Sequence, residues 1–274
     1  MITFPNAKIN FGLDVVSRRS DGYHDISTLF YPVPLCDTLE MTQLPEGCDA
    51  SLTVTGNTID CPPEKNLVMK AYRALADKYA IPPVAFRLAK NIPDGAGLGG
   101  GSADASFALR MLRDAFLPHL HDDVIAEIAA GIGADCPFFI YNKPMYAIGI
   151  GEILTPAPEV LAGYTMLLVK PEVYVSTKEA YSMIHPALPA KSIREIVCAS
   201  PDSWKFDLKN DFEPGVFSLH PVVGELKQTM YESGALYASM SGSGSSVYGI
   251  FDSANLADSL FKSLDFQQKY ILAL

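Results

Sequence analysis

The sequence predicts an α+β fold with two lobes and a cleft between them, and three observations lead to this prediction. Residues 8–16 alternate apolar and polar side chains, which is typical of a half-buried strand. Residues 66–79 place apolar side chains at helical spacing. From residue 165 onward, short strands and helices follow one another to residue 274. Strands and helices mixed in this way favour packed α+β layers.

The first half of the chain predicts further strands at 38–44, 51–55 and 84–89. Helices are expected at 66–79, 102–116 and 122–130, with Asp122 or Asp123 as the N-cap of the last one. Residues 138–141 and 145–149 read as two strands of a hairpin around 142–144.

A cluster of turn-forming residues, Pro156, Pro158 and Gly163, indicates a domain boundary. We therefore expect an N-terminal domain over 1–155 and a C-terminal domain over 156–274. In the second domain, strands are expected at 165–169, 236–240, 246–251 and 270–274, and helices at 176–184, 221–233 and 254–264. There is no internal repeat and no low-complexity segment.

Composition indicates a compact globular protein and argues against some classes of partner. Hydrophobic residues make up 49% and charged residues 19% of the chain. The net charge is −10 and no Lys/Arg run occurs, which argues against nucleic acid or an anionic membrane as the main partner. Five cysteines without a C-x-x-C pair favour free thiols in a reducing cytoplasm. Residues 1–11 do not read as a signal peptide, and charges interrupt the apolar region 124–151, so no spanning helix is expected.

A glycine-rich segment before a predicted helix is the most informative feature. Residues 92–106 read IPDGAGLGGGSADAS, with glycines at 95, 97, 99, 100 and 101. Glycine permits positive φ and lets an anion approach the backbone closely. Successive amides can then point at phosphate oxygens, and the N-terminus of the helix adds a positive partial charge. The segment predicts a phosphate-binding loop, in which Ser102 could cap the helix, contact phosphate or reach Mg²⁺.

Other interpretations of this segment fit less well. Gly95, Gly97 and Gly100 match the dinucleotide-binding pattern G-x-G-x-x-G, which would indicate a nicotinamide-dependent dehydrogenase. However, Asp114 falls within a helical stretch and a further helix follows, so the βαβ unit is missing. A Walker A loop would need Gly-Lys-Ser or Gly-Lys-Thr, which does not occur here. A flexible linker would not be flanked directly by regular structure on both sides.

Residues 93–103 resemble the second motif of the GHMP kinases, a superfamily of ATP-dependent small-molecule kinases. Residues 6–13, NAKINFGL, resemble the N-terminal motif of that superfamily, and residues 239–247, SMSGSGSSV, resemble its C-terminal glycine motif. The three motifs occur in the family's order over nearly the whole chain, so they are more specific together than any one of them alone.

Within this superfamily the sequence resembles the 4-diphosphocytidyl-2-C-methyl-D-erythritol kinases. The similarity is carried by 7–10, 133–138 and 149–152, and above all by RSDGYH at 19–24, which mevalonate and homoserine kinases lack. Three departures are small: Asn6 stands where Pro or Ser is usual, Asp94 where an apolar residue is common, and Ser106 where Ala is usual.

The resemblance implies an ATP site and a catalytic pair. Asp135 would be the general base that accepts the proton of the substrate hydroxyl, and Lys8 would hold it ionised and stabilise developing charge. Read without the family, Asp135 could equally be a turn or cap residue, and Lys8 a solvated lysine at a strand edge. The implied ATP-binding residues are Asn66, Lys90, Pro93, Asp94, Gly95, Ala96, Gly97, Leu98, Gly99, Gly100, Gly101, Ser102 and Ala103. The alternative for Asn66 is a plain N-cap, and for Lys90 a solvated charge.

The resemblance also implies how a cytidine diphosphate-linked polyol is bound. Tyr23 and Tyr181 would stack on the base, and His24 would contact its polar edge. The other implied substrate-binding residues are Asn10, Thr177, Gly242 and Ser243. The alternatives are core tyrosines, a surface histidine and an ordinary hairpin turn at 242–244.

The implied function is ATP-dependent phosphorylation of the 2-hydroxyl of 4-diphosphocytidyl-2-C-methyl-D-erythritol, in the non-mevalonate isoprenoid precursor pathway. Another GHMP kinase of the mevalonate or homoserine type, or a catalytically silent nucleotide-binding homologue, stays open as an alternative. Mg²⁺ would bridge ATP oxygens, held mainly by ATP and Ser102, because no dedicated carboxylate pair is visible. His119 and His121 have poor spacing for a metal site, so no resident metal is expected. We expect a monomer or a weak homodimer.

Overall fold

A computed structural model describes residues 1–57 and 61–274, and the α+β prediction is confirmed. The chain forms two compact units, each assembled from several segments. Unit 1 comprises 1–7, 35–94 and 99–143, and unit 2 comprises 8–34, 95–98 and 144–274. The domain boundary expected after residue 155 stays a prediction. No helix in the described part of the chain is long and apolar enough to cross a membrane.

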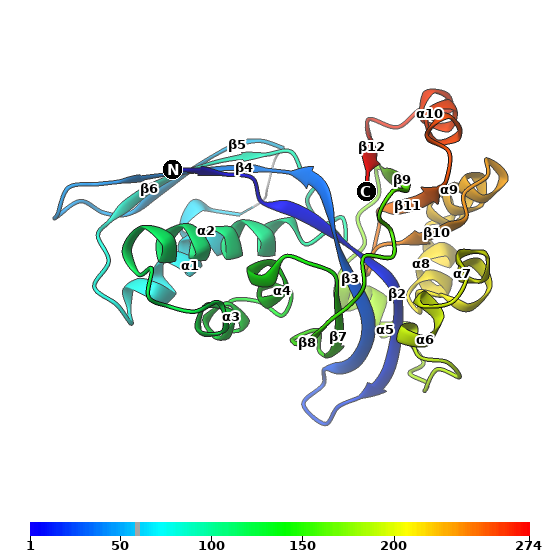
Figure 1. The fold of residues 1–274 in the computed structure, drawn as a ribbon, viewed down its shortest axis with the longest axis horizontal. Coiled ribbons are helices and arrows are strands. Elements are labelled where there is room, and N and C mark those ends of the chain that lie inside the picture. Colours follow the sequence, from blue (N-terminus) through cyan, green and yellow to red (C-terminus); the bar gives the residue numbers. More distant parts are fainter. Residues whose placement is uncertain (58–60) are drawn as a thin grey trace. The chain divides into compact units, whose positions relative to one another are not determined.

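Unit 1 is a four-stranded sheet with helices on one face (Figure 1). The strand order is β1 (Ile2–Thr3), β4 (Thr38–Gln43), β6 (Val84–Lys90), β5 (Ser51–Gly56), with only the β5–β6 pair parallel. The helices are η1 (Pro63–Lys65), α1 (Leu67–Ala76), α2 (Gly100–Phe116), α3 (Asp122–Ala130) and α4 (Cys136–Tyr141). Alternate residues of the strands, such as Phe86 and Leu88, meet the apolar face of α1 and α2 in one core.

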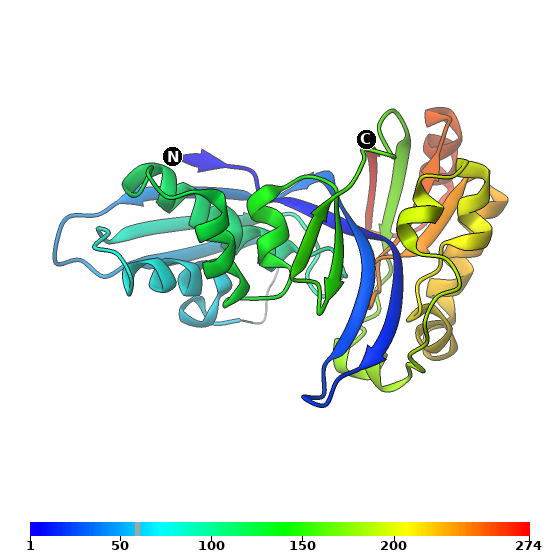
Figure 2. The same cartoon turned by 60° about the horizontal axis from the view of Figure 1, so that its bottom comes forward.

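Unit 2 contains two antiparallel sheets. The long hairpin of β2 (Asn6–Arg18) and β3 (His24–Cys36), shown in blue in Figure 2, is extended by β7 (Met145–Gly149) and β8 (Ile153–Pro156). The other sheet has the order β10 (Tyr237–Met240), β11 (Val247–Phe251), β9 (Thr165–Lys170), β12 (Gln268–Ala273).

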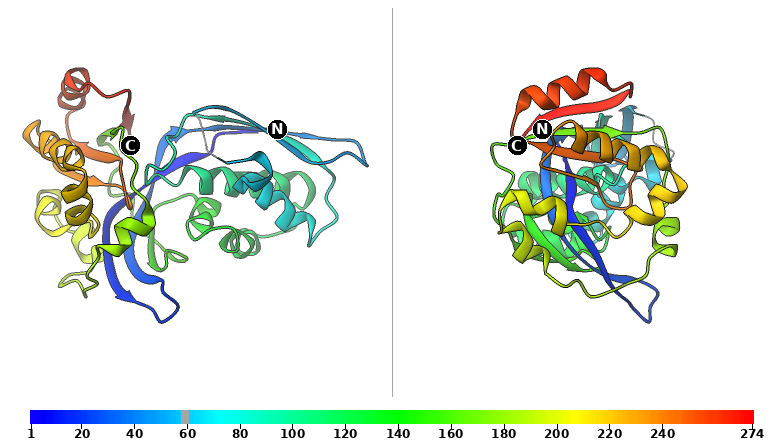
Figure 3. Two further views of the ribbon diagram at one scale, coloured as in Figure 1. Left: turned by 180° about the vertical axis from the view of Figure 1, so that it is seen from behind. Right: turned by 90° about the vertical axis from the view of Figure 1, so that its right-hand side faces the viewer.

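Helices cover one face of this second sheet. Figure 3 shows α9 (Pro221–Glu232) and α10 (Ala254–Ser263) together on that face, where they pack on β9, β10 and β11. The shorter helices are α5 (Thr177–Ser182), α6 (Ile193–Val197), α7 (Pro201–Asp207) and α8 (Glu213–Leu219). Buried aromatic rings also contact one another, with Phe11 5.0 Å from both Trp204 and Tyr237 between ring centroids.

Two local expectations are wrong. The segment 136–141 is helix α4 and not a strand, so it forms no hairpin with β7, which instead pairs with β3. Pro137 lies in the first turn of this helix, and the C-cap residue after Tyr141 is Asn142, whose φ of +49° is left-handed. At α3 the N-cap is His121, and both Asp122 and Asp123 lie in the first turn, where their charge still favours the helix dipole.

Candidate active site

The predicted phosphate loop adopts a backbone that only glycine accommodates well. Gly95, Gly97 and Gly99 have φ of +58°, +74° and +70°. Gly99 is the N-cap residue of α2, so the amides of the loop run directly into the N-terminus of the longest helix in the described part of the chain. Left-handed glycines followed by a helix N-terminus form a typical anion-binding arrangement.

The part of the loop in unit 2 is fastened by its apolar residues. Ala96 and Leu98 are 3% and 1% exposed. Their carbonyls accept hydrogen bonds: Leu98 O from Lys8 N at 2.9 Å, and Ala96 O from Ser246 N at 3.3 Å. The first half of the loop is therefore held between β2 and the C-terminal glycine turn, residues 241–246. These two bonds use carbonyl groups of the loop and none of its amides.

The two glycine motifs touch each other at Gly97. A Cβ added there would lie 2.0 Å from the carbonyl oxygen of Ser241. The Ser241 hydroxyl donates to Gly97 O at 2.8 Å and accepts from Asn10 N at 3.3 Å. Segments about 145 residues apart in sequence are thus joined by backbone packing and by one buried serine.

Lys8 begins a buried polar chain along the β2–β3 hairpin. Its ammonium donates to Asn10 Oδ1 at 2.7 Å, and Asn10 Nδ2 donates to Thr28 Oγ1 at 3.0 Å. Lys8 is 4% exposed and its Nζ lies 4.8 Å from the centroid of the Phe30 ring. The alternative of a solvated edge lysine is therefore wrong. A buried ammonium needs anionic or polar partners, and Asn10 Oδ1 is one of them.

Two polar side chains, those of Asn210 and Glu213, support the C-terminal glycine turn. This turn, residues 241–246, joins antiparallel β10 and β11. Asn210 Nδ2 donates to Met240 O at 2.8 Å and to Gly242 O at 2.9 Å, while its Oδ1 accepts from Phe212 N at 3.0 Å. Glu213 accepts from Met240 N at 2.9 Å. The segment is thus a tight hairpin turn, and its shape is fixed by buried side chains from outside the hairpin; its contact with a substrate stays a prediction.

The residues predicted to hold a base lie near one another in unit 2. His24 stacks on Tyr181 with centroids 4.8 Å apart and an interplanar angle of 21°. Burial, followed by the charge of Arg18, lowers the pKa of His24, which favours the neutral imidazole. Tyr181 also makes an edge-to-face contact with Phe212, with ring centroids 4.8 Å apart. Thr177 Oγ1 lies 3.1 Å from Ser243 Oγ. Tyr23 is 60% exposed and so is not a core tyrosine.

In unit 1, Lys90 is buried between two buried carboxylates, so the solvated alternative is wrong for this lysine as well. Its ammonium donates to Asp37 Oδ2 and, at 2.8 Å, to Asp104 Oδ2. Asp37 Oδ1 also accepts from Asn91 N at 2.6 Å and from Ile92 N at 2.8 Å, just before the loop. Burial raises the pKa of Asp104 to about 7, although Lys90 opposes that shift. The second carboxylate, Asp37, also raises the pKa of Asp104, because two buried carboxylates share one ammonium.

Asp135 occupies the N-cap position of α4, yet its carboxylate makes no capping hydrogen bond. The preceding turn lies beside the end of the phosphate loop, because a Cβ added at Gly133 would be 3.9 Å from Ser102 Oγ. Ser106 Oγ lies 2.8 Å from both Ser102 O and Cys136 O, which ties α2 to the start of α4. The turn that carries Asp135 is therefore attached to the helix that begins at the loop.

Family models and relatives agree on what this chain is similar to. The model described as "GHMP kinases N terminal domain" matches residues 66–143, and "GHMP kinases C terminal" matches 184–268. The "4-diphosphocytidyl-2-C-methyl-D-erythritol kinase" of Parabacteroides distasonis is 54% identical over 252 residues, 92% of each chain, and that of Bacteroides fragilis is 52% identical over the same share. The chain belongs to the 4-diphosphocytidyl-2-C-methyl-D-erythritol kinase family of GHMP kinases. It is therefore a phosphotransferase, as the motifs predicted.

Solved structures support the assignment to this kinase family. The crystal structure of a 4-(cytidine 5'-diphospho)-2C-methyl-D-erythritol kinase matches with a TM-score of 0.80 and 29% identity, covering 99% of this chain and 98% of that one. The homoserine kinase of Cytophaga hutchinsonii matches with a TM-score of 0.76 at 17% identity, which shows a shared fold alone.

Sequence reasoning missed several buried polar residues that hold the predicted site residues of this kinase in place. Asn66 does cap α1, its Oδ1 accepting from Val68 N at 2.9 Å, so one acceptor site of its amide oxygen is already used. Asn210 and Glu213 were missed, although they stand three positions apart in the segment NDFE, just before and at the start of α8. Asp37, which lies between β3 and β4, and Asp104, which lies in α2, gave no signal, since a single carboxylate in the sequence reads as a surface residue.

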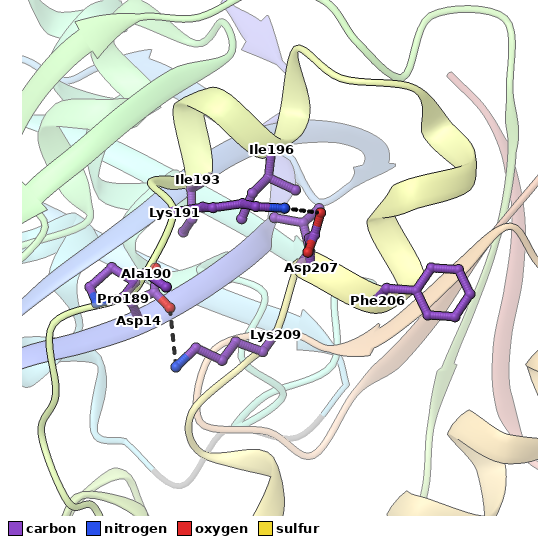
Figure 4. A pocket seen from close by; sticks show the side chains of 10 residues that line it. Asp14, Pro189, Ala190, Lys191, Ile193, Ile196, Phe206, Asp207 and Lys209 are labelled. Carbon is purple, nitrogen blue, oxygen red and sulfur yellow. Dashed lines mark hydrogen bonds and ion pairs between the residues drawn. The ribbon is translucent and has the colours of Figure 1, made fainter.

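A pocket of about 280 Å³ in unit 2 lies apart from all predicted site residues of this kinase (Figure 4). Its lysines are already paired: Lys191 with Asp207 at 3.0 Å, and Lys209 with Asp14 at 3.6 Å. Burial raises the pKa of Asp14 despite the charge of Lys209. With each cation matched by a carboxylate, this pocket does not have the unbalanced positive charge that a phosphate site needs.

Proposed function

We propose that this kinase transfers the γ-phosphoryl group of ATP to the 2-hydroxyl of 4-diphosphocytidyl-2-C-methyl-D-erythritol, in the non-mevalonate isoprenoid precursor pathway. The observation that carries the proposal is the combination of relatives of that name at 54% identity with an intact glycine loop running into α2. The stacked His24–Tyr181 pair supports a flat base in the acceptor substrate, because aromatic faces bind such rings well.

We further propose that Lys8 and Asp135 serve the acceptor hydroxyl. Asp135 would take its proton as the oxygen forms a bond to the γ-phosphorus, and the bond from that phosphorus to the β–γ bridging oxygen would break to release ADP. Lys8 would stabilise the negative charge at the attacking oxygen. Each residue is tied to its own half of the loop: Lys8 N bonds Leu98 O, and the turn before Asp135 lies beside Ser102.

The remaining predicted residues divide between two ligands. For ATP, we propose the loop amides of 93–103, with Asn66 and Lys90 on the nucleotide side; Lys90 would act while still paired with its two carboxylates. For the acceptor, we propose Asn10 and Thr177 with the turn at Gly242 and Ser243, and Tyr23, His24 and Tyr181 around its base.

Mg²⁺ would be held by ATP oxygens and by the Ser102 hydroxyl, which is half-buried at the start of α2. Among residues 1–57 and 61–274, no three His, Cys, Asp or Glu side chains gather into a metal cluster. A Mg²⁺ that keeps its waters and phosphate ligands needs few protein ligands, so this donor set fits. Bound Mg²⁺ would neutralise the charge that develops on the transferred phosphoryl group.

A coupled assay of ADP release tests the proposal with three acceptors. Turnover with 4-diphosphocytidyl-2-C-methyl-D-erythritol, but not with mevalonate or homoserine, is expected. Turnover of either of the other two alone would assign the chain a different acceptor, and ATP binding without any turnover would make it a silent homologue. We also propose a cytoplasmic location, supported by five free cysteines, and a monomer or weak homodimer, which sedimentation velocity would test.

A further inference from the structure

An exposed tyrosine lies against the phosphate loop, outside every motif described above. Tyr174 is 73% exposed. A Cβ added at Gly95 would lie 3.0 Å from its Cε2 and 3.1 Å from its Cδ2. One edge of the tyrosine ring therefore contacts the first glycine of the loop, and it is glycine at this position that leaves room for the ring.

The backbone on both sides of Tyr174 is fixed. Val173 O accepts hydrogen bonds from the buried Ser245 hydroxyl at 2.7 Å and from Lys170 Nζ at 2.9 Å. On the other side, the Val175 side chain is 4% exposed and belongs to the core of unit 2. The Tyr174 ring therefore extends from a segment whose backbone is anchored on both sides, so its exposure is not the result of a loose loop. A large aromatic side chain exposed from an ordered segment is typical of a binding surface.

The surroundings of Tyr174 point to a phosphate ligand. Within three residues along the chain, Thr177 contacts Ser243 of the glycine turn. Because the Tyr174 side chain is largely exposed, its hydroxyl is open to a ligand. A phenol is a good donor to an anionic oxygen, and such a bond is stronger than one between neutral groups.

We propose that the Tyr174 hydroxyl donates a hydrogen bond to a phosphate oxygen of a ligand held at the glycine loop. The proposal rests on the proposed function, since it takes the loop as the phosphate site. Two ligands carry the required chemistry: the triphosphate of ATP and the diphosphate of the acceptor. The Tyr174 ring would cover the loop at Gly95. The Tyr174 hydroxyl would position the phosphate of the ligand so that the loop amides can also bind it.

Steady-state kinetics of Tyr174→Phe, with each substrate varied in turn, test this proposal. Phe keeps the ring on Gly95 and removes only the donor. We expect KM to rise about ten- to hundredfold for the substrate whose phosphate is bound, with a smaller change in kcat. A rise in KM for ATP would identify the triphosphate, and a rise for the acceptor would identify its diphosphate. The control Phe206→Ala removes another exposed aromatic, 78% exposed in the same unit, and should change neither constant.

Tyr174→Ala separates a hydrogen bond from simple packing. If Tyr174→Phe behaves as wild type while Tyr174→Ala is impaired, the ring only supports the loop and the proposal is overturned. Wild-type constants in both variants overturn it as well. If the wild type turns over none of the acceptors, calorimetric titration of Tyr174→Phe with an ATP analogue and with cytidine diphosphate still measures the hydrogen bond, so failure of the proposed function is distinguishable from failure of this inference.

Discussion

Gly97→Ala should damage both stability and nucleotide binding, because it acts where the two glycine motifs touch. The added Cβ would lie 2.0 Å from Ser241 O, whereas real Cβ contacts essentially never fall below 3.0 Å. The loop and the turn must therefore separate by about 1 Å. The oxygen belongs to the backbone and is held by its hairpin, so no flexible side chain can move to relieve the overlap.

The free-energy cost of Gly97→Ala has two parts. A φ of +74° costs a residue with a Cβ about 1–2 kcal/mol. Forcing an extra carbon into a packed contact costs about 1–3 kcal/mol more. The sum, about 2–5 kcal/mol, appears as lost stability if the loop stays in place. If the loop shifts instead, the same energy corresponds to a loss of ATP affinity of roughly thirtyfold or more.

Urea unfolding and calorimetric ATP titration measure these two outcomes. The matched control is Gly47→Ala: Gly47 has a φ of +84°, but an added Cβ would meet nothing within 4 Å. The control should lose only about 1–2 kcal/mol and keep wild-type ATP affinity. If Gly97→Ala matches Gly47→Ala in both measurements, the contact between the glycine motifs has no energetic weight and the reasoning fails.

Three further predictions concern buried polar groups. Asn210→Ala removes the side-chain donor of Gly242 O and leaves Met240 O with the longer bond from Ser239 Oγ at 3.3 Å. It should lower the free energy of unfolding by about 1–3 kcal/mol in urea titrations, the cost of one unpaired buried acceptor; an unchanged free energy of unfolding would contradict this. Asp104→Asn should remove a pH dependence. The pKa of Asp104 is raised by burial to about 7 in the folded state, so its contribution to stability is full below pH 4 and is lost as pH rises to 7; a constant stability difference between wild type and variant over that range would refute it. Ser241→Ala should raise the KM for ATP, measured by ADP release, because the hydrogen bond to Gly97 O is lost. The control is Ser239→Ala, which removes an equally buried hydroxyl that bonds Glu213. This control should leave the KM for ATP unchanged.

Local signals in the sequence predicted much of the fold. The strand at 8–16 and the helices at 66–79 and 102–116 are present as β2, α1 and α2, because apolar spacing is a local property that burial then fixes. The loop was predictable for the same reason, since its glycines are adjacent in sequence.

Features that depend on distant partners were not predictable. Strand β3 was not predicted at all: it contains Pro32 and Pro34, which argue against an interior strand, yet it lies between β2 and β7. Helix α4 was taken for a strand because an apolar run of this length fits both structures. The burial of Lys90 could not be inferred, because Asp37 and Asp104 reach it from 53 and 14 residues away.

Asp135→Asn in a single-turnover assay tests the central claim most directly. Rapid quenching after mixing with ATP and 4-diphosphocytidyl-2-C-methyl-D-erythritol measures phosphoryl transfer itself, and calorimetry measures ATP affinity in parallel. Removing a general base typically costs about 10²- to 10⁴-fold in rate. The account predicts a loss of that order with unchanged ATP affinity, and no loss for the control Asp123→Asn, whose carboxylate accepts from Tyr141 Oη at the surface. Phosphoryl transfer at the wild-type rate in Asp135→Asn would contradict it.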